Sequence, residues 1–449
     1  MNQPLDTEGR QSVNPVVAYP HPVYAWYVIS IFYLAYTLAF IDRIIVSFLV
    51  GPIRADFNIT DFQFSLISGL AFAIFYATLG IPIARLADTR NRRNIITVGI
   101  TIWSLMTAIC GLTSNYWQLF LARLGVGVGE ATLSPAAISM ISDYFPKERR
   151  ALPINIYSAG VQGGAGLANI FGGLIVGYAM AGGIQEIALF GDMRAWQIAF
   201  IVVGLPGLLI AVLMVTVKEP PRHGIRQDQA KVCFADTLAY LNRHKGVYFT
   251  LMVGAALSSM ASYGTFNWVP ALFERVYDWG PAKIGTTFGL ITLAIGTTGL
   301  VSSGFIVGAM LRAGRTAPYS WLMIITIACV IPPSALLVAV DNPYWTLGCL
   351  SLMIMFLSAP IGLVQAALAA ITPNEMRAQV IAIYLLVVTI FGLSSGPSAV
   401  AAVTDFYFSN DAAVGMSISI VSVISCTLGV LTLYAGIGAY RRKVAQDGT

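Results

Sequence analysis

Charged residues are scarce in this sequence. Asp, Glu, Lys and Arg make up only 10% of the 449 positions, whereas apolar residues make up 57% and the mean hydropathy is +0.74. A soluble domain carries roughly 25% charged residues. A chain with so little charge would not stay in water, so we expect lipid to be the solvent for most of it.

Cysteine and histidine are too few, or too scattered, for several kinds of chemistry. The cysteines form no close pairs and four of them lie in apolar runs, which argues against a disulfide framework or a metal site. They are Cys110, Cys233, Cys329, Cys349 and Cys426. The three histidines, at 21, 223 and 244, all lie outside the apolar runs. No lysine follows a glycine, so there is no phosphate-binding loop and we expect no ATP drive.

Long apolar runs are abundant. A helix that crosses the hydrocarbon core needs roughly 20 mostly apolar residues. Twelve such runs are centred near residues 38, 75, 103, 130, 165, 206, 260, 297, 328, 358, 391 and 425. One long basic break separates the sixth and seventh runs, which indicates a linker between two halves. The predicted organisation is a cytoplasmic tail (1–23), a six-helix bundle (24–217), a cytoplasmic linker (218–246), a second bundle (247–440) and a cytoplasmic tail (441–449).

The positions of Lys and Arg predict the orientation. With both termini in the cytoplasm, the inner segments hold 20 of the 26 basic residues, and the outer loops hold only Arg54, Arg194, Arg275 and Lys283. Cytoplasmic segments are enriched in Lys and Arg, so this arrangement is strongly favoured, and it requires an even number of crossings. The tail at 1–23 lacks the basic-then-apolar pattern of a cleaved signal, so we expect it to be retained.

A short duplication links the two halves. The residues Pro146, Glu148, Arg150, Ala151, Ile154, Ile156 and Tyr157 recur 227 positions later as Pro373, Glu375, Arg377, Ala378, Ile381, Ile383 and Tyr384. Both copies lie at the junction of the fourth and fifth runs of a half. A proline and an acid are also common at a helix start, but the matching position favours duplication. Parallel six-helix repeats are a transporter architecture, with the substrate held near the midplane.

The loop between the second and third runs reads ARLADTRNRR, which resembles the major facilitator signature G-x-L-A-D-R-x-G-R-R. The matching residues are Leu86, Ala87, Asp88, Arg92 and Arg93, and the departures are Ala84, Thr89 and Asn91. The resemblance implies an all-α membrane protein of the major facilitator fold, with twelve transmembrane helices in two pseudo-symmetric six-helix bundles. It also implies a cytoplasmic gate of Asp88, Arg92 and Arg93, with Asp143 as an arginine partner.

A narrower resemblance covers the N-terminal half. The runs FIDR in the first span, ADTRNRR in the loop and RLGVGVGEA in the fourth span are similar to the Spinster family of lipid transporters. Related organic-anion symporters also carry a DR pair in the first span and an arginine in the fourth. The resemblance therefore implies a lysophospholipid or sphingoid substrate, with a small organic anion as the alternative.

Four ionisable residues lie well inside spans: Asp42, Arg43, Arg123 and Glu130. Each costs at least ~2.5–3.5 kcal/mol at a helix centre, so each needs a partner or water, and such residues are functional by default. Glu130 lies seven residues beyond Arg123 and hence on the same helical face, whereas Asp42 and Arg43 point about 100° apart. At least one of the adjacent pair should therefore face the fourth span. The alternative is a purely structural ion-pair cluster.

These charges suggest how transport could be driven. Without a buried histidine, a proton must travel on a carboxylate, and Glu130 and Asp42 are the deep candidates. Burial disfavours an ionised carboxyl group whereas a nearby guanidinium favours it, so movement of Arg43 or Arg123 could load and release a proton. Sodium coupling would use the same oxygens.

The C-terminal half has no buried ionisable residue of this kind. The polar residues that we expect it to contribute to a central cavity are Tyr263, Asn267 and Gln365. A cavity that is charged on one wall and apolar on the other suits an amphipathic solute with its ionic head near Arg43. We expect Arg43, Arg123, Tyr263 and Asn267 to bind that substrate.

We therefore expect a proton-coupled carrier of an amphipathic, lipid-like solute, without cofactor or metal. Its expected partners are that solute, protons and membrane lipids, with no nucleic acid, and the expected assembly is a monomer in a bacterial inner membrane. The alternative from another class, a lipid receptor or intramembrane enzyme, is disfavoured because hydrolases and acyltransferases need a nucleophile–base pair, usually with histidine.

Overall fold

The structure, a computed structural model, describes residues 19–146, 149–182, 186–187, 191–222 and 234–447. Almost all of these residues are helical. The N-terminal half contains α1 (Pro22–Ile45), η1 (Val46–Phe48), α2 (Val50–Phe57), α3 (Asp61–Ser65), η2 (Leu66–Ala71), α4 (Phe72–Thr89), α5 (Arg92–Cys110), α6 (Tyr116–Glu130), α7 (Leu133–Tyr144), α8 (Ala151–Met180) and α9 (Ala195–Val215). A hairpin of two-residue strands, β1 (Glu186–Ile187) and β2 (Gly191–Asp192), lies between α8 and α9.

The described part of the linker contains the short helix α10 (Phe234–Arg243). The C-terminal half contains α11 (Lys245–Tyr277), α12 (Pro281–Ile291), η4 (Thr292–Gly296), α13 (Thr297–Arg312), α14 (Pro318–Ala335), α15 (Pro343–Ile371), α16 (Asn374–Val388), η5 (Thr389–Ser394), α17 (Ser395–Ala402), η6 (Val403–Phe408), η7 (Asp411–Ala413) and α18 (Val414–Asp447).

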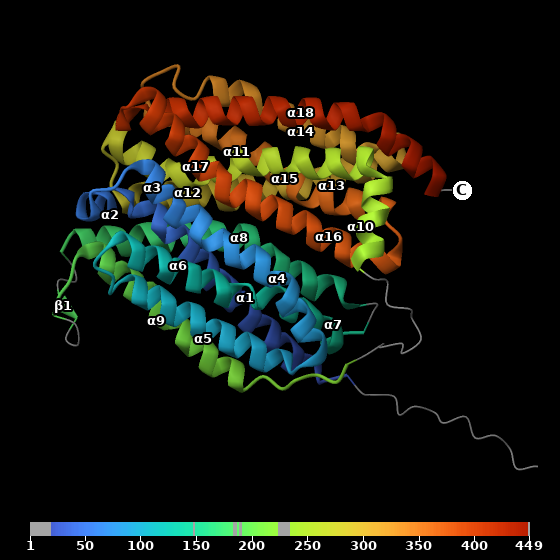
Figure 1. The fold of residues 1–449 in the computed structure, drawn as a ribbon, viewed down its shortest axis with the longest axis horizontal. Helices are drawn as coiled ribbons and strands as arrows, with labels where there is room; N and C mark the ends of the chain where they lie inside the picture. Colours follow the sequence, from blue (N-terminus) through green and yellow to red (C-terminus); the bar gives the residue numbers. More distant parts are fainter. Residues whose placement is uncertain (1–18, 147–148, 183–185, 188–190, 223–233, 448–449) are drawn as a thin grey trace, which may run out of the picture.

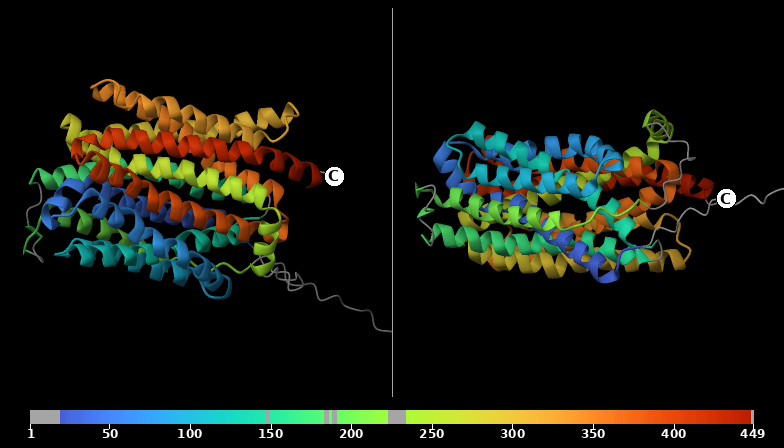
Figure 2. Two further views of the ribbon diagram at one scale, coloured as in Figure 1. Left: turned by 45° about the horizontal axis from the view of Figure 1, so that its top comes forward. Right: turned by 90° about the horizontal axis from the view of Figure 1, so that it is seen from below.

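The two halves form two helical layers. Figure 1 shows the N-terminal half, in blue and green, lying against the C-terminal half, in yellow to red, and Figure 2 shows that the long helices run in roughly the same direction in both. Within the halves, α1 packs on α8, α5 on α9, and α11 on α18. Contacts between the halves run mainly from α8 to α12 and from η2 and α4 to η5. The end of α18 lies beside α10, at the end of the bundle that the sequence assigns to the cytoplasm.

The twelve-helix architecture predicted from the sequence is confirmed. Among the residues that the structure describes, eleven helical segments are long and apolar enough to span a membrane. The twelfth is α11, which has 33 residues and so is about 50 Å long. It is less apolar than the others because Ser258, Ser259, Ser262 and Asn267 interrupt its middle.

Within the described residues, three spans contain π-helical segments. The segments η2 and η4 interrupt one span each, and the span Glu375–Phe408 contains η5 in its interior and η6 at its end. Two of them, η2 and η5, pack against each other across the interface between the halves. Because π-helical insertions concentrate at functional sites, they direct attention to the residues that follow η2.

Glycine lets the halves approach closely at α8 and α12. A Cβ atom on Gly173 would lie 2.5 Å from the Pro281 carbonyl oxygen and 2.8 Å from Gly285 Cα, closer than real Cβ contacts occur. The glycines of the fifth span therefore bring two backbones into contact, as small residues do in membranes.

Candidate functional site

Four charged side chains meet inside the N-terminal half. Asp42 and Arg43 come from the last turns of α1, and Arg123 and Glu130 come from α6. The side chains of Arg123 and Glu130 are fully buried and that of Asp42 almost so, whereas Arg43 keeps 15% of its side chain exposed. The four residues that the sequence places inside the bilayer thus lie together.

They form two ion pairs between the same two helices. Arg43 Nε and Nη2 each lie 2.6 Å from Glu130 Oε2. Arg123 Nη1 donates to Asp42 Oδ1 at 2.9 Å, and the hydroxyl of Thr107 on α5 donates to the other oxygen of the same carboxylate. Asp42 and Arg43 point in different directions from α1, so each reaches a different residue on one face of α6. Both adjacent residues, and not only one, face the fourth span.

Aromatic rings surround the guanidinium of Arg43. Its Cζ atom lies 4.7 Å from the ring centre of Phe72, 4.6 Å from that of Tyr76 and 5.2 Å from that of Phe40. The Phe72 ring is also 5.8 Å from Arg123 Cζ, so one ring contacts both guanidinium groups. Phe72 is the first residue after the π-helical segment η2. Cation–π contacts of this kind stabilise a partly dehydrated cation without neutralising it.

Several polar atoms of this cluster have no hydrogen-bond partner among the described residues. They are Nε and Nη2 of Arg123 and Oε1 of Glu130, all of them buried. Buried polar groups in proteins are nearly always paired with protein or water. The cluster can therefore accept a further oxygen atom at Arg123 and a further proton at Glu130.

The cluster opens on a cavity of about 350 Å³ between the halves. The N-terminal wall includes Tyr36, Phe40, Arg43, Phe72, Tyr76 and Arg123. The C-terminal wall includes Tyr263, Phe266, Asn267, Leu357, Pro360 and Gln365. No lining residue from the C-terminal half, within the part of the chain that the structure describes, is an acid, a lysine, an arginine or a histidine. The cavity is thus charged on one wall and uncharged on the other.

Tyr263, Asn267 and Gln365, which the sequence singles out in this half, all line the cavity. Sequence reasoning did not find three further polar residues of the same wall, Ser258, Ser259 and Ser262. Serine is common in membrane helices, where its hydroxyl can bond to the helix backbone, so it carries little signal by itself. The signal that was available is that Ser262 lies three and four residues after the other two, which places all three near one face of a helix.

A family model described as the Major Facilitator Superfamily matches residues 32–397. The match covers most of the chain, including the residues of both ion pairs. The chain belongs to the Major Facilitator Superfamily. It is accordingly a transporter and a multi-pass protein of the inner membrane.

Individual relatives and structures refine this assignment. An "MFS-type efflux pump" of Mycolicibacterium smegmatis is 27% identical over 439 residues, which cover 95% of this chain and 96% of that protein. A "Probable sphingolipid transporter spinster homolog 2" of Arabidopsis thaliana is 25% identical over 273 residues, or 58% of this chain and 53% of that protein. A crystal structure of a bacterial homolog of the human lysosomal transporter Spinster, inward-facing and unoccupied, has a TM-score of 0.81 and 26% identity. The superposition with that structure covers 95% of this chain and 99% of the other. The resemblance to Spinster proteins is therefore supported.

The residues of the superfamily's cytoplasmic signature lie at the inner end of the N-terminal half. Arg92 is buried, with Nη1 2.5 Å from Asp143 Oδ2 and 2.9 Å from the Ser139 hydroxyl. Arg93, by contrast, directs its side chain to Asn94. Asp88 lies in α4, but its side chain is outside the described residues. The structure thus brings Arg92 and Asp143 together.

Sequence reasoning did not find the acid that completes this cluster. Glu219, the first acid after α9, accepts from Arg92 Nε at 2.7 Å and from the backbone amide of Arg93 at 3.0 Å. Arg92 Nη2 also donates to the Pro220 carbonyl at 3.1 Å. The start of the linker is therefore attached to the N-terminal half, and its charged composition alone did not indicate where it would bind.

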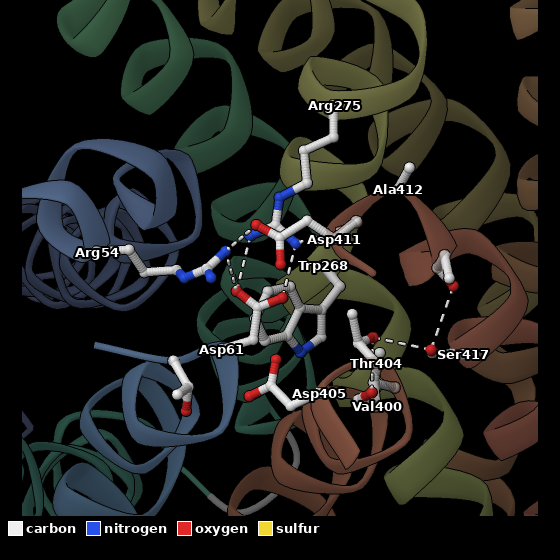
Figure 3. A network of polar contacts seen from close by, with 12 residues as sticks. Arg54, Asp61, Trp268, Arg275, Val400, Thr404, Asp405, Asp411, Ala412 and Ser417 are labelled. Atoms are coloured by element: carbon white, nitrogen blue, oxygen red, sulfur yellow. Dashed lines mark hydrogen bonds and ion pairs between the residues drawn. The ribbon is translucent and has the colours of Figure 1, made fainter. Parts of the chain in front are cut away.

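At the opposite, extracellular end, a network of charges joins the two halves (Figure 3). Asp61 accepts from Arg275 Nη1 and Nη2 at 2.6 and 2.7 Å and lies 2.9 Å from Arg54 Nη1. Arg54 also donates to Asp411 at 2.6 Å. Arg54 and Asp61 belong to the N-terminal half, and Arg275 and Asp411 to the C-terminal half. Asp405 on η6 accepts from the backbone amide of residue 62, so it caps the start of α3 from across the interface.

Proposed function

We propose that this member of the superfamily is a proton-coupled secondary transporter of an amphipathic anion of the lysophospholipid or sphingoid-phosphate type. The observation that carries the proposal is the ion pair between Arg43 and Glu130 at the edge of a cavity whose opposite wall has no charge. An acidic head group would bind at the guanidinium side. Its apolar chain would lie against the C-terminal half.

The two arginines give the head-group site its chemistry. Arg43 keeps part of its side chain exposed to the cavity, and Arg123, which also lines the cavity, has two nitrogen atoms, Nε and Nη2, without a hydrogen-bond partner among the described residues. A guanidinium group binds carboxylate or phosphate oxygens with paired hydrogen bonds, which suits a planar or tetrahedral anion. The rings of Phe40, Phe72 and Tyr76 would contact the first carbons of the chain.

Glu130 would couple this site to protons. A proton arriving at Oε1 neutralises the carboxylate, and Arg43, which keeps only 15% of its side chain exposed, is then left without its counter-ion. An unpaired buried charge costs several kcal/mol, so the protonated protein favours an anion at Arg43. Loss of the proton restores the pair and displaces the anion. Protonation and anion binding therefore favour each other.

The extracellular network supports alternating access. Because it joins the halves on one side of the cavity, its rupture would be required before a solute could enter or leave there. Carriers of this architecture move one half against the other around a central site. The name of one relative, a probable sphingolipid transporter, agrees with transport of an amphipathic compound, and that of another, an efflux pump, agrees with transport.

The test is uptake of a fluorescent lysophospholipid into proteoliposomes, with and without an inward proton gradient. Gradient-driven uptake is expected for the wild type and for Glu375→Gln, a control that removes an exposed acid which does not line the cavity. Glu130→Gln should lose the response to the gradient. If Glu130→Gln still transports and still follows the gradient, the coupling mechanism is wrong.

A second candidate, symport of a small organic anion, is favoured by the presence of two guanidinium groups in one cavity. A compact di-anion or sugar acid could occupy both without using the apolar wall. Uptake of a labelled sugar acid, measured in parallel, distinguishes the two candidates. Symport of a small organic anion predicts uptake of the sugar acid, whereas transport of an amphipathic anion predicts uptake that single-chain lipids inhibit by competition. Counterflow of labelled against unlabelled solute identifies a carrier and excludes a receptor.

A further inference from the structure

The two carboxylates of the charged cluster have different hydrogen-bond partners. Glu130 contacts Arg43 through one oxygen, and its other oxygen has no partner among the described residues. Asp42 has a donor on each oxygen, Arg123 on Oδ1 and the Thr107 hydroxyl on Oδ2. A carboxylate with donors on both oxygens is stabilised in its ionised form. The two acids are therefore unequally prepared to take a proton.

Thr107 is not part of the cavity. It is fully buried on α5, and none of the cavity-lining residues comes from that helix. Its contact with Asp42 reaches from α5 to α1, between residues 65 positions apart in the sequence. The hydroxyl therefore acts on the carboxylate from behind, away from any solute.

The other threonines of α5 show that this contact is unusual. Thr97 donates to the Arg93 carbonyl at 2.9 Å, and Thr101 donates to the Thr97 carbonyl at 2.8 Å. A threonine within a helix commonly bonds to the carbonyl four residues earlier in this way. Thr107 instead directs its hydroxyl to a side chain on another helix.

We propose that Thr107 is a positioning residue that keeps Asp42 ionised. Asp42 is then the permanent counter-ion of Arg123, and Glu130 alone carries the proton. The proposal rests on the proton coupling proposed above. It assigns different tasks to the two acids that the sequence presents as equivalent candidates.

The charges around Asp42 make the hydroxyl decisive. Asp42 faces Arg123 and Glu130 from α6, Cys110 from α5 and its neighbour Arg43 on α1. The arginines favour the ionised acid, whereas burial and an ionised Glu130 oppose it. With these influences opposed, loss of one donor to the carboxylate is expected to favour its protonation.

The experiment compares Thr107→Val, which keeps the shape and removes the hydroxyl, with Thr107→Ser, which keeps the hydroxyl. Thr101→Val is the matched control. The Thr101 hydroxyl lies on the same helix but donates to the helix backbone, so this substitution removes a hydroxyl without affecting Asp42. A hydrogen bond to a charged group corresponds to roughly a ten- to hundredfold change in proton affinity. In Thr107→Val, protonation of Asp42 should therefore move up by about one to two pH units, into the pH range of the transport assay, and appear as a second protonation beside that of Glu130.

Two readouts test this. The pH dependence of lysophospholipid uptake should steepen from one proton to two in Thr107→Val, and remain that of the wild type in Thr107→Ser and Thr101→Val. Infrared difference spectra in a Glu130→Gln background should show, for Thr107→Val, a carboxylic-acid band on acidification that is additional to the bands of the background itself and of Thr101→Val. If Thr107→Val does not yield folded protein, Thr107→Ala removes the same hydroxyl without adding a methyl group in its place.

The outcomes separate the two proposals. If wild-type uptake depends on pH and the pH profile of Thr107→Val is identical to that of the wild type, the proposed role of Thr107 is overturned and the proton coupling is left intact. A wild type without any pH dependence would overturn the coupling. The infrared band would still decide whether Thr107 keeps Asp42 ionised, because that readout does not depend on transport.

Discussion

The extracellular charge network makes a strong prediction for Asp61→Asn. The Asp61 side chain is fully buried and contacts both Arg54 and Arg275, whose side chains keep only 21% and 14% of their exposure. The substitution leaves Arg275 with a 3.4 Å contact to the Asp411 carbonyl and leaves Arg54 with the Asp411 carboxylate. Removing one partner of a buried ion pair costs about 3–5 kcal/mol. We take about 3 kcal/mol because both arginines keep some access to water.

The contact between Asp61 and Arg275 acts only on the state in which the extracellular ends are closed, because these two residues belong to opposite halves, whereas the contact between Asp61 and Arg54 lies within one half. A difference of about 3 kcal/mol corresponds to roughly a hundredfold change in the ratio of closed to open molecules. The assay is labelling of a cysteine introduced at Ser262, on the cavity wall, by a maleimide that cannot cross membranes. It is added to right-side-out vesicles of a variant without the native cysteines.

Asp61→Asn should increase the labelling rate by about ten- to a hundredfold, within the range set by that energy. Arg194→Gln is the control, because Arg194 pairs with Asp56 at 3.2 Å within one half and is 55% exposed. It should label at the parent rate. Equal rates for Asp61→Asn and its parent would refute the view that this network holds the extracellular face closed.

Three further predictions follow from other contacts. Glu219→Gln should destabilise the detergent-solubilised protein by about 1.5–3 kcal/mol, because Arg92 loses a charged partner. The thermal midpoint should therefore fall, and a melt with an unchanged midpoint would contradict this prediction. Gly173→Leu should separate the halves and increase labelling from the extracellular side, since even its Cβ would overlap α12; unchanged labelling would show that the interface adapts. Arg43→Lys keeps the charge but not the two-nitrogen contact with Glu130, so lysophospholipid affinity measured by fluorescence titration should fall about tenfold, and an unchanged affinity would place the head group elsewhere.

Part of the site could be predicted from the sequence because a charged residue inside a membrane span is rare and indicates a functional or structural role. A charged residue in the middle of an apolar run is costly, so Asp42, Arg43, Arg123 and Glu130 stand out from the sequence alone. Helical geometry then predicts that residues 123 and 130 share a face and that residues 42 and 43 do not. The structure adds the pairing itself: Asp42 contacts Arg123 and Arg43 contacts Glu130, so each residue of α1 is joined to a different residue of α6.

Other features carried no such signal. Arg54, Asp61, Arg275 and Asp411 lie near span ends, where charge is ordinary, so nothing in their local sequence distinguishes an inter-half network from four solvated residues. Thr107 is one of several threonines in its helix, and its partner is distant in sequence. These contacts depend on how helices are placed against one another, which residue spacing within a helix does not specify.

The uneven distribution of charge in the cavity has a consequence for how such a protein can diversify. The ionisable residues proposed to couple transport to protons lie in one half, and the wall opposite them, with Tyr263, Asn267 and Gln365, is uncharged. Substitutions on that wall can change which solutes fit without altering any residue of the two ion pairs. A lineage could therefore exchange one cargo for another while retaining its energy source, and selection for new substrates should favour changes in the C-terminal half.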